Sequence, residues 1–139
     1  MGFLIDTCIW IDVEQGRLGP ADVGRYTGTE PVYLSPVTLA ELRLGVEMAA
    51  DAGVRQKRMA TYRRMKRKPM LPIDDDTADV FGEVAGILAK DGARAYRTRV
   101  QDLWIASQAI QHLMPLVTRN AKDFRGIPGL DLVEIEMPR

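Results

Sequence analysis

Residues 2–12 read GFLIDTCIWID, and this stretch sets the expectations for the rest of the chain. Residues 3–5 form a short continuous apolar run, which is typical of a strand buried on both faces of a parallel sheet. Asp6 follows at the carboxyl end of that strand, where open α/β sheets usually bind their ligands. An aspartate in this place can also cap a helix, here one expected over residues 7–13. The stretch therefore predicts an α/β fold and leaves Asp6 with two interpretations, a helix cap and a functional carboxylate.

The composition is that of an ordinary globular protein. The 139 residues include 19 basic and 19 acidic side chains, so the net charge is zero and favours no particular partner. A chain of this length buries a core without staples, and we expect one domain over residues 1–139. The single cysteine, Cys8, excludes an intrachain disulfide and is expected to be a small buried side chain rather than a nucleophile. With no signal-peptide pattern and no membrane-spanning apolar run, we expect a cytoplasmic protein without membrane contact.

Extended and helical segments alternate along the rest of the chain. Further extended segments are predicted at residues 31–34, 69–73, 116–117 and 130–135. Helices are predicted at residues 21–26, 38–50, 53–68, 74–91 and 100–113. Such alternation is typical of βαβ units, which predicts the α/β class with a central parallel sheet.

Glu41 has two interpretations within the helix predicted at 38–50. Thr38 and Glu41 have the spacing of a capping box, which would give Glu41 a structural role. Glu41 also shares a helix face with Leu44 and Met48, and an apolar face of this kind is expected to turn inward. The local sequence does not decide between a cap and an inward-facing carboxylate.

Positive charge is concentrated in two segments. Eight basic residues occur between positions 55 and 68 without one acidic residue, and positions 94–99 hold three arginines around a tyrosine. A charge run is commonly a solvated helix face. The alternative interpretation is a phosphate-binding stripe, because clustered positive charge creates a local field that the net charge hides. The candidate nucleic-acid contacts in these segments are Arg63, Arg64, Arg67, Arg97 and Arg99.

Three consecutive aspartates at positions 74–76 raise the question of a metal site. They stand at the start of a predicted amphipathic helix. Acidic residues in that place cap the helix and complement its dipole, so we assign them a structural role.

Four other acidic residues fall where the predicted topology can bring them together. Asp6 and Asp123 follow strands, whereas Glu41 and Asp102 lie near the starts of helices. Carboxylates brought close together repel one another and need a cation, and oxygen ligands without His or Cys suit Mg²⁺ or Mn²⁺. Such an ion activates water and stabilises charge during displacement at phosphorus. A nucleic-acid phosphodiester is therefore the expected substrate, with the basic segments supplying affinity.

Two other classes of protein are alternatives to this hypothesis. A phosphoryl-transfer enzyme with Asp6 as nucleophile needs a second aspartate two residues later, where Cys8 stands, and a receiver domain needs an acidic pair near its first aspartate. A non-catalytic RNA- or partner-binding module on the same fold is the alternative that stays open. It predicts RNA binding that is indifferent to EDTA.

Four motifs occur in a fixed order across almost the whole chain: LIDTCIW at 4–10, SPVTLAELRLG at 35–45, DLWIA at 102–106, and LVTRNAKDF at 116–124 followed by IPGL. Together they resemble those of PIN-domain ribonucleases and, more narrowly, VapC-type toxins of bacterial toxin–antitoxin pairs. The resemblance implies a three-layer α/β/α sandwich and an Mg²⁺- or Mn²⁺-dependent endoribonuclease, with tRNA as the favoured substrate. It also implies homodimerisation and inhibition by a small antitoxin of the VapB type.

The resemblance also assigns residues. The family's acidic positions fall on Asp6, Glu41 and Asp102 as metal ligands, and Asp123 matches a less regular fourth position. Thr118 and Asn120 are the polar neighbours expected to contact RNA. The segments around Tyr96 and His112 depart from the commoner pattern, which affects the groove wall and leaves the ligand set intact.

Overall fold

The computed structural model describes residues 2–92 and 99–136. Within them, four strands form a parallel sheet in the order β2-β1-β3-β4. The strands are β1 (Phe3–Ile5), β2 (Val32–Tyr33), β3 (Leu116–Thr118) and β4 (Leu132–Glu134). The helices are α1 (Thr7–Glu14), α2 (Pro20–Thr27), α3 (Pro36–Glu47), α4 (Ala52–Lys66), α5 (Asp75–Lys90), α7 (Val100–Gln111) and the short 3-10 helix η1 (Ala121–Asp123).

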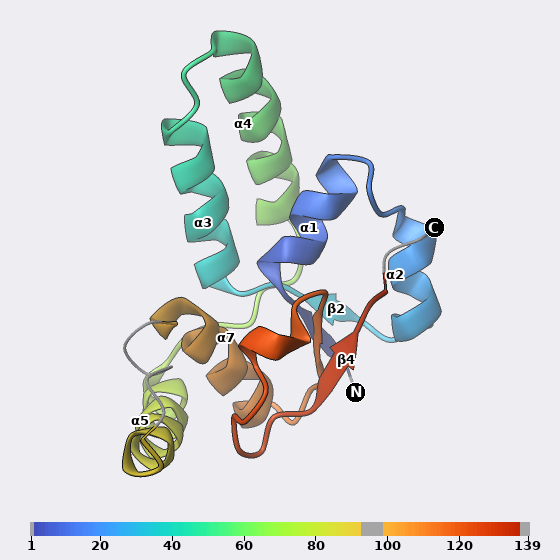
Figure 1. Ribbon diagram of the computed structural model, residues 1–139. Coiled ribbons are helices and arrows are strands. Elements are labelled where there is room, and N and C mark those ends of the chain that lie inside the picture. The colour runs from blue at the N-terminus through green and yellow to red at the C-terminus, as the bar shows by residue number, and fades with distance from the viewer. Residues whose placement is uncertain (1, 93–98, 137–139) are drawn as a thin grey trace.

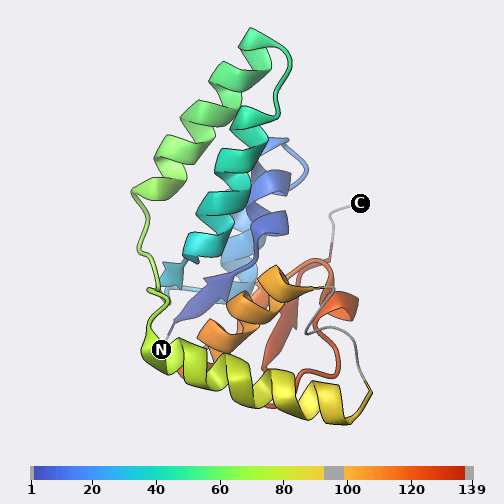
Figure 2. The same ribbon diagram turned by 90° about the vertical axis from the view of Figure 1, so that its left-hand side faces the viewer.

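Helices cover both faces of this sheet (Figures 1 and 2). Leu4 and Leu116 are fully buried in a core that they share with residues of α5 and α7. The neighbouring Ile5 and Val117 point the other way, into a second core with residues of α1 and α2. The arrangement is the predicted three-layer α/β/α sandwich. None of the described helices is long and apolar enough to cross a membrane.

Helix α3 begins earlier than predicted. Ser35 caps it, accepting a hydrogen bond from the Val37 backbone N–H at 3.0 Å, and Pro36 occupies the first helical position. Thr38 lies inside the helix and is fully buried. The predicted Thr38–Glu41 capping box is therefore wrong, because the helix starts at the Ser-Pro pair that directly follows the predicted extended segment 31–34.

The outer half of α3 is also more exposed than predicted. Leu44 is 59% exposed and Met48 is 73% exposed, so the face expected to turn inward reaches solvent. The reason is visible in Figure 1, where α3 and α4 form a hairpin that projects away from the sheet. Beyond its first turns the main packing partner of α3 is α4, and Leu42 and Val46 are buried on that part of the helix.

The remaining predicted segments agree with the structure apart from their ends. Strands β2 and β4 are shorter than the predicted segments 31–34 and 130–135. The extended segment predicted at 69–73 contributes one isolated parallel bridge, between Met70 and Leu34. This bridge ties the end of the α3–α4 hairpin back to the edge of the sheet next to β2.

Candidate active site

The four predicted acidic residues come from four elements that meet at the carboxyl edge of the sheet. Asp6 follows β1, Glu41 lies in the second turn of α3, Asp102 lies in the first turn of α7, and Asp123 ends η1. Their charges act on one another, because those of Asp6 and Asp102 raise the pKa of Glu41, and that of Asp123 raises the pKa of both Asp6 and Asp102. These electrostatic interactions link the four carboxylates, which we call the acid cluster.

Asp6 is the predicted helix cap, and its second oxygen is hydrogen-bonded as well. Its Oδ1 accepts a hydrogen bond from the Thr7 backbone N–H at 2.8 Å, which caps α1. Its Oδ2 accepts one from the Thr118 hydroxyl at 2.8 Å and one from the Cys8 thiol at 3.2 Å. Burial raises the pKa of Asp6, and these three hydrogen bonds oppose that shift. The carboxylate is thus fixed in orientation by donors on both oxygens.

Cys8 contributes to the site as a neutral thiol. Burial and the charge of Asp6 raise its pKa to about 11, so it keeps its proton at neutral pH and can donate to Asp6. The expectation that Cys8 is no nucleophile agrees with this pKa. The structure adds a contact with Asp6 that the sequence analysis did not foresee.

Glu41 is held by a pair of threonines. The Thr7 hydroxyl donates to Glu41 Oε1 at 3.2 Å and lies 2.9 Å from the Thr38 hydroxyl. With its single proton directed at Glu41, Thr7 accepts the proton of Thr38. Burial is the main cause that raises the pKa of Glu41, followed by the charges of Asp6 and Asp102.

Asp102 is the member of the cluster with the least compensation. Burial, together with the charges of Asp6 and Asp123, raises its pKa to about 6, and the positive charge of Arg99 opposes the shift. Among the described residues, none donates a hydrogen bond to its carboxylate. This group therefore changes its charge close to neutral pH, and a bound cation would stabilise its ionised form.

Arg99 lies at the rim of the cluster and forms an ion pair with Asp123. The hydrogen bond and the charge of Asp123 raise the pKa of the guanidinium, and the side chain is 45% exposed. Its predicted contact with nucleic acid thus starts from a position beside the acidic residues. The neighbouring candidate, Arg97, lies outside the described residues.

The other predicted contact residues differ in where they lie relative to the cluster. Thr118 is fully buried, so its hydroxyl is placed to orient Asp6 rather than to face solvent. The Asn120 backbone N–H donates to the Thr118 hydroxyl at 3.0 Å, and its side chain is half-buried. The predicted contacts Arg63 and Arg64 lie in the last turn of α4, and Arg67 is its C-cap. Helix α4 forms the projecting hairpin with α3 (Figure 1).

One buried ion network escaped the sequence analysis. Asp12 on α1 has a fully buried side chain, and its Oδ1 lies 2.8 Å from Nη2 of Arg17. Its Oδ2 lies 2.6 Å from Nε of Arg119, which follows β3 directly. The network joins α1 to the segment that carries Thr118 and Asp123. A lone acid within the apolar run of residues 9–13 was the available signal, since a buried carboxylate needs a cation.

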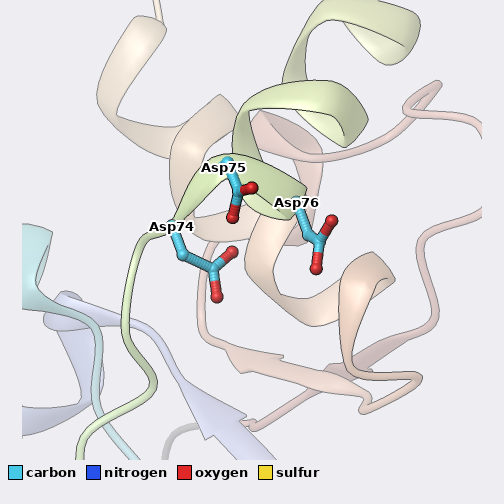
Figure 3. A group of neighbouring side chains, drawn as sticks. All are labelled: Asp74, Asp75 and Asp76. Carbon is cyan, nitrogen blue, oxygen red and sulfur yellow. The ribbon is translucent and has the colours of Figure 1, made fainter.

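The aspartates at 74–76 are exposed and lie at the start of α5 (Figure 3). Their carboxylate oxygens lie within 4.8 Å of one another. Asp74 accepts hydrogen bonds at 3.1 Å from the Thr77 backbone N–H and from Gln111 Nε2, which makes it the cap of α5. The capping role assigned from the sequence accounts for this geometry.

The donor set of the acid cluster fits a hard divalent cation. Its ligands are carboxylate oxygens, the neighbouring thiol stays protonated, and Arg99 is the one cation that forms an ion pair with its described members. Oxygen ligands with excess negative charge are what Mg²⁺ and Mn²⁺ bind. The sandwich and the carboxylates at the edge of its sheet define an α/β protein whose acid cluster has the ligand chemistry of a metal site.

Comparisons with known proteins give the family. The family model described as PIN domain matches residues 3–130, so this chain belongs to the PIN-domain family. Ribonuclease VapC5 of Mycobacterium tuberculosis is 36% identical over 132 residues, covering 95% of this chain and 92% of that protein. Ribonuclease VapC of Rickettsia bellii is 29% identical and covers 99% of this chain and 98% of that protein. These relatives place the chain among the VapC ribonucleases, the toxins of VapBC toxin–antitoxin systems.

Solved structures agree with this assignment. The structure of VapBC-5 from Mycobacterium tuberculosis, described as a member of the VapBC family of toxin–antitoxin systems, aligns with a TM-score of 0.73 and 30% identity. The alignment covers 96% of this chain and 98% of that one. DNA-bound VapBC from Salmonella typhimurium aligns with a TM-score of 0.83 at 23% identity, over 98% of this chain and 99% of that one, and supports the fold.

Proposed function

We propose that this VapC-type ribonuclease is an endoribonuclease that depends on Mg²⁺ or Mn²⁺, with tRNA as its favoured substrate. The observation that carries the proposal is the acid cluster, in which burial, with a further contribution from neighbouring charges, raises the pKa values of Asp6, Glu41 and Asp102. Retaining such a cluster at neutral pH favours a bound cation. Residues 1–139 act as one domain in the cytoplasm, where the RNA substrate is found.

Asp6, Asp102 and Glu41 are the residues that would hold the ion, with Asp123 completing the pocket. A bound ion of this type lowers the pKa of water and stabilises the charge that develops on the phosphoryl oxygens. Thr118, Cys8 and the Thr7 backbone N–H keep the Asp6 carboxylate in one orientation.

Two features of Glu41 suit it to accept a proton. Thr7 occupies its Oε1, and no described residue donates to its Oε2, which is free to take a proton from the attacking water. The raised pKa of Glu41 suits that role, because a base works best when its pKa approaches the working pH. Hydrolysis by this attacking water leaves a 5′-phosphate and a 3′-hydroxyl.

The basic residues would bind phosphates around the scissile bond. Arg99 lies at the cluster itself and is placed to contact the nearest phosphate once Asp123 has another counter-ion. More distant phosphates would meet the stripe on α4, and Asn120 lies half-buried beside the cluster. The expected distant contacts are Arg63, Arg64 and Arg67, and Arg97 keeps its predicted role.

A VapB-type antitoxin is the proposed protein partner, and a homodimer is the proposed assembly. Support for the antitoxin comes from the similar structures, which are described as VapBC systems. Exposed apolar side chains on the α3–α4 hairpin, such as Leu44 and Met48, are available for protein contacts.

The test uses purified, antitoxin-free protein with end-labelled total tRNA and with ribosomal RNA, in Mg²⁺, Mn²⁺ or EDTA. We expect discrete cuts that need metal and that disappear with Asp102→Asn. Asp75→Asn is the matched control, because it removes an exposed aspartate of the α5 cap instead, and it should cleave normally. RNA binding without cleavage under every metal condition would favour the non-catalytic binding module.

A further inference from the structure

A cavity opens beside the acid cluster, between α1, α3 and α4. It measures about 240 Å³, and Glu41 forms part of its wall, so it adjoins the candidate active site at that residue. Pockets for drug-sized ligands measure roughly 300–1,000 Å³, which means that this one suits a single planar ring system. The side chains that line it include Ile11, Glu14, Gln15, Leu42 and Arg58.

The charged groups of this cavity are held in place by neighbours. The Thr61 hydroxyl donates to Glu14 Oε1 at 2.9 Å, and no described residue donates to Glu14 Oε2. Arg58 Nη1 donates to the Gly45 carbonyl at 2.7 Å, and no described residue accepts from its other nitrogens. Groups that are already oriented lose little freedom when a ligand binds. The Glu14 carboxylate and the Arg58 guanidinium are therefore each anchored by one hydrogen bond and keep atoms free to bond a ligand.

A carboxylate and a guanidinium in a cavity with apolar walls match the edges of a guanine base. Guanine alone among the four bases presents two adjacent donors, N1–H and N2–H₂, together with two adjacent acceptors, O6 and N7. A carboxylate accepts from the first pair, and an arginine donates to the second. Unstacked bases of single-stranded RNA are recognised along their edges in this way. Ile11 and Leu42 supply apolar surface for the faces of the ring.

Resting on the proposed ribonuclease activity, we propose that this cavity binds a guanine base of the RNA at one fixed position beside the cut. Glu14 accepts from N1–H and N2–H₂, while Arg58 donates to O6 and N7. Because Glu41 is shared between the cavity and the acid cluster, the bound base lies close to the scissile phosphate. The cavity thereby contributes to the choice of cleavage site.

The first test is cleavage of a randomised RNA pool with Mn²⁺, followed by sequencing of the cut ends. We expect guanine to be enriched at one position beside the cut in the wild-type products. Glu14→Gln should lower that enrichment about tenfold, since it removes one bidentate pair, while metal-dependent cleavage continues. Glu47→Gln is the matched control, because Glu47 is an exposed carboxylate of α3 that pairs with Arg43 and Arg55 outside the cavity.

The second test replaces guanine with inosine at the preferred position of a defined RNA. Inosine lacks the N2 amino group, so the wild type should cleave it about tenfold more slowly, whereas Glu14→Gln should cleave both RNAs alike. The glutamine amide oxygen still accepts from Thr61, which preserves local packing. Arg58→Lys with 7-deazaguanine gives the same comparison at the other edge of the base and serves if the first variant does not fold.

The possible results separate this inference from the proposed function. Wild-type cleavage without a guanine preference would overturn the cavity's role, as would an active Glu14→Gln variant with an unchanged preference. A wild type that cleaves no RNA in any metal would overturn the proposed function itself, and this inference with it.

Discussion

Asp12 and the acid cluster around Asp6 are compensated in opposite ways. Asp12 is fully buried and has an arginine at each of its oxygens, Arg17 at 2.8 Å and Arg119 at 2.6 Å. The acid cluster around Asp6 holds four carboxylates and one described ion pair, that of Arg99 with Asp123. The paired Asp12 is suited to a structural role, whereas the under-compensated cluster supports the proposed binding of a cation.

The largest expected effect concerns Asp12, the acid that is paired with two arginines. Asp12→Asn leaves Arg17 and Arg119 without their shared partner and should lower the free energy of unfolding by about 3 kcal/mol. Urea unfolding in EDTA measures this loss, and Mg²⁺ should not change it. A loss below about 0.5 kcal/mol would mean that the network contributes little to the fold.

The next effect concerns the orientation of Asp6. Thr118→Val removes the 2.8 Å hydrogen bond to Asp6 Oδ2 and should weaken Mn²⁺ binding about 10- to 100-fold, the usual cost of losing a group that orients a metal ligand. Calorimetric titration with Mn²⁺ measures the affinity. Thr27→Val is the control, since within the described part of the chain that buried hydroxyl bonds only to the Val23 carbonyl of its own helix. Unchanged Mn²⁺ affinity with weaker RNA binding would instead favour the direct RNA contact.

The smallest effect is a gain in stability. The pKa of Asp102 is about 6 in the folded chain against an ordinary 3.8, so the folded chain binds more protons between these values. Its free energy of unfolding therefore falls as pH rises through that window. Without metal, Asp102→Asn should be more stable than the wild type at pH 7.5 by about 1 kcal/mol, a value reduced for partial exposure of the side chain.

Thermal unfolding in EDTA measures this gain, which corresponds to about 3 °C in Tm. The advantage should shrink at pH 5 and vanish below pH 4, where Asp102 is protonated in both folded and unfolded chains. An Asp102→Asn variant that is less stable than the wild type at pH 7.5 would contradict the conclusion that the charge of Asp102 is uncompensated in the folded chain.

The sequence predicted the placement of the acid cluster because each of its members stands at a strand end or near a helix start. What holds those members depends on how distant segments pack. The Thr7 contact with Glu41 and the Thr118 contact with Asp6 join residues 34 and 112 positions apart. Neither follows from local periodicity. Arg119 as a partner of Asp12 was hidden for the same reason.

The errors about α3 have a different origin. Ser35 and Pro36 end a strand and also start a helix, and only the second role fixes where the helix begins. Leu44 and Met48 lie on the predicted apolar face, yet the hairpin carries them past the edge of the sheet. Helical periodicity shows that a face is apolar but does not show how far the core extends beneath it.

The most direct measurement of the central claim is calorimetric titration of Mn²⁺ into the wild type, Asp102→Asn and Asp75→Asn at pH 7.5. We expect the wild type and Asp75→Asn to bind the ion alike. Asp102→Asn should bind at least about 100-fold more weakly, because it removes a ligand of the under-compensated cluster. Equal binding by Asp102→Asn, or a loss confined to Asp75→Asn, would contradict the assignment of the metal to the carboxyl edge of the sheet.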